Sequence, residues 1–150
     1  MLSHLLSRLK EPLAKNEAEV AELLPLAAAV LYLEVAWADH DIADEEMDLI
    51  SRILAAQFDL PPEELHIIVT ESRAQHESSV GLYRFTRIIN DAWDEEAKYQ
   101  LVVKLWQLAL SDSELHSFEE HTIRKIAELL YVSHSRFIEA KLTAKRGADS

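Results

Sequence analysis

The stretch AWADHDIADEEMDLISRI, at residues 36–53, occurs a second time in modified form as ALSDSELHSFEEHTIRKI at residues 109–126. The copies align without a gap, and their identical positions are Ala36, Asp39, Glu46, Ile50 and Ile53, matched by Ala109, Asp112, Glu119, Ile123 and Ile126. Shared helical periodicity explains the apolar matches. It does not explain the matched carboxylates, so a function is sought first at these.

The composition around this repeat is that of a helical globular chain. The 150 residues suit one domain with a sizeable core, and 49% of them are hydrophobic. There are only 2 glycines and 4 prolines, which favours helices over turn-rich sheets.

The charge of the chain limits the classes of partner that it can bind. The formal net charge is −12, and such a surface repels phosphate backbones, so nucleic acid is not expected as a partner. Cations or a basic protein partner fit better. There is no cysteine, which excludes disulfides and thiolate metal sites and permits a reducing compartment.

No segment predicts membrane insertion. The first 15 residues lack the uninterrupted apolar run of a signal peptide. The most apolar stretch, residues 23–37, contains Pro25 and Glu34 and is too short to span a bilayer. The expected location is therefore cytoplasmic, and the sequence leaves the oligomeric state open.

Hydrophobic periodicity predicts an all-α fold of seven to eight helices. The domain is expected at 16–145, preceded by an N-terminal helix or arm at 1–15 and followed by a disordered tail at 146–150. Helices are expected at about 16–39, 44–57, 62–74, 82–90, 94–109, 117–130 and from 133 onward. The duplicated unit is a long helix, an acidic turn and a second helix.

Each acidic turn carries three matched carboxylates. They are Asp39, Asp41 and Glu46 in the first turn, and Asp112, Glu114 and Glu119 in the second. A chain that reverses between the two helices brings three such side chains toward one centre. Hard cations such as calcium, magnesium and manganese prefer oxygen ligands of this kind, so these six residues are the predicted metal ligands.

The turn is not an EF-hand. Counted from Asp39 as the first ligand, the twelfth position is Ile50, and Asp44 stands where the EF-hand needs glycine. A cation site here is therefore incomplete within one turn, rich in water, or assembled from both turns.

A simpler interpretation needs no metal. Acidic residues are common at helix starts because they cap the helix and face the positive end of its dipole. Asp39 and Asp112 precede the caps, where a carboxylate faces the negative end of the preceding helix's dipole, so they need a separate reason. The matched cations Arg52 and Lys125 could offset this unfavourable interaction without a metal.

Both turns resemble those of the TerB-like tellurite-resistance family. The resemblance lies in Ala38-Asp39-His40-Asp41-Ile42 and its second copy, in FTRIINDAWDEEAKYQLVVKLW at 85–106 and in LLYVS at 129–133, and it covers roughly residues 20–142. It implies an all-helical fold, a cytoplasmic location where the domain stands alone, divalent metal at the acidic turns, and a link to tellurite resistance and stress response, often beside membrane-linked partners. His40 and Ser113 depart from the family, which usually has glycine after the first aspartate.

Other chemistry finds little support in the sequence. His40, His116 and His121 lack the spacing of zinc ligands, and Trp37, Trp93 and Trp106 are typical of a core. No nucleophile motif or phosphate loop is present. The leading hypothesis is a non-enzymatic cation-binding domain with no catalytic residues. The alternatives are an acidic protein-interaction module without metal and a magnesium-dependent hydrolase of phosphorylated small molecules.

Overall fold

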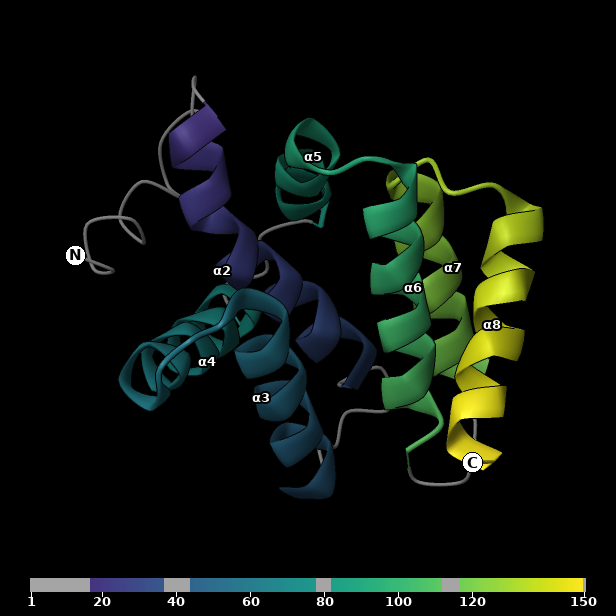
Figure 1. The fold of residues 1–150 in the computed structure, drawn as a ribbon, viewed down its shortest axis with the longest axis horizontal. Helices are drawn as coiled ribbons and strands as arrows, with labels where there is room; N and C mark the ends of the chain where they lie inside the picture. Colours follow the sequence, from purple (N-terminus) through teal and green to yellow (C-terminus); the bar gives the residue numbers. More distant parts are fainter. Residues whose placement is uncertain (1–16, 37–43, 78–81, 112–116, 150) are drawn as a thin grey trace.

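A computed structural model describes residues 17–36, 44–77, 82–111 and 117–149, and these residues form seven helices and no strand. The all-α prediction is confirmed. The helices are α2 (Glu17–Ala36), α3 (Asp44–Phe58), α4 (Pro62–Glu77), α5 (Tyr83–Ala92), α6 (Glu95–Ala109), α7 (Ser117–Leu129) and α8 (His134–Asp149) (Figure 1). None of these helices is long and apolar enough to cross a membrane. The expected helix or arm at 1–15 lies outside the described residues.

Helix α2 is the centre of the core. From Leu26 to Ala36 every side chain except Glu34 is almost fully buried. Five helices surround it, namely α3, α4, α5, α6 and α7. The small side chains of residues 27–29, Ala-Ala-Ala, let these neighbours approach closely.

The duplication extends beyond the two helices and turn that the sequence predicted. It comprises three helices, because α2 packs against α3 and α4 as α6 packs against α7 and α8. Figure 1 shows the two triplets side by side. Contacts between the triplets are reciprocal: α2 meets α7, α6 meets α3, and α2 meets α6. An approximate twofold relation between the units gives this pattern. Helix α5, between the triplets in the chain, packs against α2 and α7.

The second helix of each unit ends in the same way. Asp59 after α3 and Tyr131 after α7 are left-handed, with φ of 51° and 61°. The next amide donates back five residues in both cases, from Leu60 to the Ala55 carbonyl at 3.2 Å and from Val132 to Ala127 at 2.9 Å. This is the Schellman helix end, which usually has glycine at the left-handed position.

Two helix starts match the sequence patterns. The Asp94 carboxylate accepts the Ala97 amide at 2.9 Å, as its place before α6 predicts. The Ser133 hydroxyl accepts the Arg136 amide at 3.3 Å at the start of α8.

Two helix ends extend further than expected. Helix α4 continues to Glu77, beyond its predicted end at residue 74, and α8 continues to Asp149 through most of the predicted disordered tail. No proline interrupts residues 143–149, and Arg146 in the last turn faces the negative end of the α8 dipole. Polar composition alone therefore misplaced both ends.

The left-handed cap residues give a test of this architecture. Tyr131→Gly should stabilise the protein by up to about 1 kcal/mol, because glycine adopts φ > 0 without the steric cost of a side chain. Tyr131 is 78% exposed, so little packing is lost. Glu128→Gly, at an exposed site inside α7, should instead cost about 1 kcal/mol. Urea unfolding measures both, and equal losses would contradict the assigned helix end.

Candidate functional site

The acidic turns lie mostly outside the described residues. Asp39, Asp41, Asp112 and Glu114 belong to this part of the chain. The structure does describe the third carboxylate of each turn, Glu46 and Glu119. Each is the third residue of its helix, in the first turn of α3 or of α7.

Glu46 and Glu119 are both buried. Glu46 is 6% exposed and Glu119 is 2% exposed, and they are the only charged side chains buried among the described residues. Each interacts with other groups of the chain. Burial of an ionised carboxylate is costly unless positive or hydrogen-bonding groups compensate for it, and the positive end of the helix dipole favours a carboxylate at this position.

Acidic residues at other helix starts behave differently. Glu63 and Glu64 in the first turn of α4, and Glu95 and Glu96 in the first turn of α6, are all exposed. The helix dipole favours a carboxylate near the start of a helix, and an exposed side chain already satisfies that preference. The burial of Glu46 and Glu119 therefore needs a reason beyond the helix start, and that reason is shared by the two copies of the repeat.

The cations, tryptophans and histidines considered in the sequence analysis differ in burial and in contacts. Arg52 and Lys125 are exposed, and no ion pair reaches either from the described residues. Trp106 is fully buried, as predicted for a core residue, and Trp93 stacks on Phe58 with ring centroids 6.1 Å apart. His121 is exposed. Within the described ranges no three His, Asp or Glu side chains cluster as metal ligands do. Trp37, His40 and His116 lie outside these ranges.

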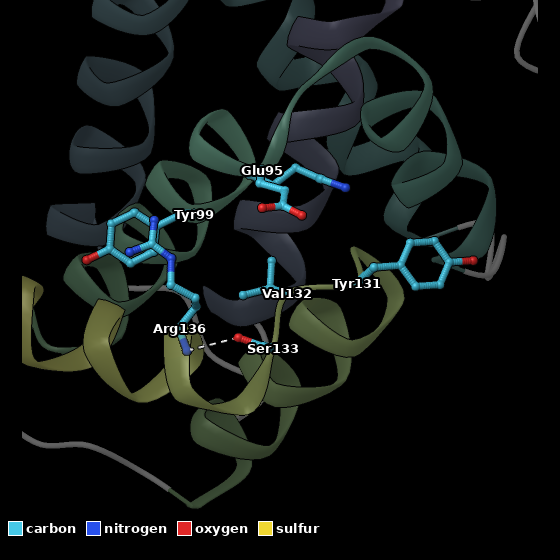
Figure 2. Close-up of a pocket in the computed structure, with 7 residues that line it drawn as sticks. Glu95, Tyr99, Tyr131, Val132, Ser133 and Arg136 are labelled. Atoms are coloured by element: carbon cyan, nitrogen blue, oxygen red, sulfur yellow. Dashed lines mark hydrogen bonds between the residues drawn. The ribbon is translucent and has the colours of Figure 1, made fainter.

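Sequence reasoning did not select the pocket between α6 and the start of α8. Its volume is about 100 Å³. It is lined by Glu95, Lys98, Tyr99, Tyr131, Val132, Ser133 and Arg136 (Figure 2). Figure 2 shows Arg136 across the Tyr99 ring, whereas the Tyr131 ring points away from the other labelled side chains.

The cations of this pocket already have partners. The Arg136 guanidinium lies 3.7 Å from the centroid of the Tyr99 ring and donates to Glu139 at 2.8 Å and to Glu96 at 2.9 Å. The hydrogen bond to Glu139 is the main reason that the pKa of Arg136 is raised. Lys98 donates to the Asn90 side chain at 3.3 Å, and Asn90 donates to the Leu129 carbonyl at 3.0 Å. We therefore interpret the pocket as a structural junction between α5, α6, α7 and α8.

The helical duplication and the two buried glutamates define a class: an all-helical domain built on a repeated unit, with a matched buried glutamate in each copy. Comparison with known families identifies the class more closely. The sequence profile of the family described as "Tellurite resistance protein TerB" matches residues 25–142. The chain belongs to the TerB family, which confirms the resemblance found in the sequence. No curated protein and no solved structure matches the chain.

The junction in Figure 2 has a testable role in stability. Arg136→Lys should lower the urea midpoint, because an ammonium group cannot stack on Tyr99 and bond two carboxylates in the plane of a guanidinium. Lys145→Ala, at an exposed site on the same helix, should leave the midpoint nearly unchanged. If Arg136→Lys is as harmless as Lys145→Ala, the stacking contributes nothing measurable.

Proposed function

We propose that this TerB-family protein binds a divalent cation at its two acidic turns and acts without catalysis. Glu46 and Glu119 are the buried anchors of the site, and Asp39, Asp41, Asp112 and Glu114 are the further oxygen ligands. The observation that carries the proposal is that the two matched glutamates are the only charged side chains buried among the described residues.

The donor chemistry fits a hard cation. Carboxylate oxygens suit calcium, magnesium and manganese, and a site of this kind accepts water or backbone carbonyls as its remaining ligands. The partners that Glu46 and Glu119 have within the chain would hold each carboxylate in place, as hydrogen bonds do for the ligands of other metal sites. A bound cation would add its charge to that of the helix start and offset the cost of burial further.

The location and the biological role follow from the proposal and the family. The family name links the chain to tellurite resistance. We infer a cytoplasmic domain in a stress response, in which the cation strengthens the fold or alters an acidic surface that faces a basic protein. An association with a membrane complex would then occur through that partner.

Titration with calcium, manganese and magnesium salts, followed by calorimetry and amide NMR, tests the site. Glu46→Gln and Glu119→Gln should each weaken binding by about tenfold or more, because the amide keeps the size of the side chain but loses its charge. Glu63→Gln removes an exposed acid from another helix start and should leave binding unchanged. A bound cation should also raise the melting temperature of the wild-type protein.

Three results would contradict the proposal. The assigned ligands are wrong if the double variant Asp39→Asn, Asp112→Asn binds the cation as well as the wild type. A partner interaction that depends strongly on salt, in a protein that binds no divalent metal, would indicate the interaction module instead. Magnesium-dependent turnover of a nucleotide panel would indicate the hydrolase.

A further inference from the structure

A second, larger cavity lies between α3 and α6, and neither Glu46 nor Glu119 lines it. It is an open groove of about 420 Å³ lined by Arg52, Ile53, Ala56, Gln57 and Lys104. The volume is within the range of small-molecule sites, which are mainly apolar with a few placed polar groups. Ile53 and Ala56 supply the apolar part, and the cations come from two different helices.

Neither cation of the groove is compensated within the described part of the chain. No carboxylate pairs with Arg52 or with Lys104 there, whereas Arg136 of the α6–α8 pocket has two carboxylate partners. Lys104 is half-buried, and burial lowers its pKa. A partly desolvated lysine without a counterion costs folding free energy.

The first copy of the repeat has a different residue at the position of this lysine. At the 73-residue spacing of the repeat, Lys104 of α6 corresponds to Leu31 of α2, which is fully buried. Helix α5 packs against α2 and α7, the pair that corresponds to α6 and α3. One copy of the surface is therefore covered, and the other is an open groove that has a lysine in place of the leucine.

A third polar group completes the groove. The Tyr32 hydroxyl donates to Oε1 of Gln57 at 2.6 Å from within the core. This bond occupies the acceptor end of the amide and leaves its nitrogen to donate at the groove. The groove thus combines two cations and an amide donor with an apolar wall, and acceptor-only ligands complement such a set.

We propose that the groove binds a small amphiphilic anion, whose carboxylate or phosphate head contacts Arg52 and Lys104 and whose short aliphatic part covers Ile53 and Ala56. The negative charge of the whole protein opposes any anion, but at physiological ionic strength charges beyond about 8 Å are largely screened, so the two nearby cations dominate. The same cations disfavour a basic occupant, including the N-terminal stretch with Arg8 and Lys10.

Amide NMR of the full chain, titrated with octanoate, tests the proposal. Saturable shifts are expected at residues 52–57 and near 104. Octanol, which lacks the charge, and acetate, which lacks the chain, should each bind more weakly than octanoate. Octyl phosphate in a parallel titration shows whether the site prefers a carboxylate or a phosphate head. Binding should also raise the pKa of Lys104, followed through its side-chain NMR signals, because an anion favours the charged amine.

Matched variants locate the site. Lys104→Met and Arg52→Met should each weaken octanoate binding by about tenfold, the usual effect of losing one charged hydrogen bond. Lys125→Met removes the repeat counterpart of Arg52 from a surface without this groove and should leave binding unchanged. Thermal unfolding checks the fold, and Lys104→Met should melt no lower than the wild type, because it removes a half-buried charge that has no carboxylate partner among the described residues.

The outcomes separate the proposal from its rivals. Equal shifts with octanol and octanoate, or unchanged binding by Lys104→Met, would overturn it. So would localised shifts with an acidic peptide but none with octanoate, which would make the groove a protein-docking surface. Because the octanoate titrations are carried out without divalent metal, they test the groove whether or not the acidic turns bind a cation.

Discussion

The burial of α2 on all sides is the constraint on which the rest of the structure depends. A helix enclosed by five others must be apolar around its whole circumference, and the stretch from Leu26 to Val35 meets that demand apart from Tyr32 and Glu34. The Tyr32 hydroxyl is satisfied by Gln57, and burial raises the pKa of Tyr32. The five helices around it, α3 to α7, are arranged by the need to cover α2.

Helix α6 is the counterpart of α2 in the second unit, but it is buried on only part of its circumference. Its buried face includes Leu101, Leu105 and Trp106 and packs mainly against α8 and α2, while Gln100 and Gln107 are exposed. The covering helix α5 lies on the α2 side. The two units therefore share a plan but not an environment. Side chains retained in both copies belong to the shared arrangement of helices, and those that differ show where the surfaces of the two units have diverged.

Much of the fold could be predicted from the sequence. The helix starts at 44, 62, 95 and 117 follow from acidic or proline residues before apolar runs, and the structure has helices beginning at these residues. The three-helix extent of the repeat was missed, because α4 and α8 share no evident pattern of residues. Tyr131 was missed as a helix end, because tyrosine gives no signal for the left-handed conformation that glycine would have indicated.

The candidate site could be predicted only in part, because sequence does not report burial of a charged residue. The spacing identified Glu46 and Glu119 as a matched pair. Glu63 and Glu95 are also acidic residues at helix starts, yet they are exposed, and the sequence does not show this difference. The groove was missed for the same reason: Lys104 on an amphipathic helix resembles any solvent-facing lysine. Only the packing of α3 against α6 shows that it is half-buried.

Helix α3 joins the two proposed sites. It has Glu46 in its first turn and Arg52 six residues later, about 9 Å along the axis at 1.5 Å per residue. This separation slightly exceeds the screening length of about 8 Å at physiological ionic strength, so charges bound at the two sites would interact weakly there and more strongly at low salt. A cation at the turn would favour an anion in the groove, and by thermodynamic linkage the anion would favour the cation to the same degree. If both ligands bind, their opposite charges near one helix would let each influence the other without a change of shape.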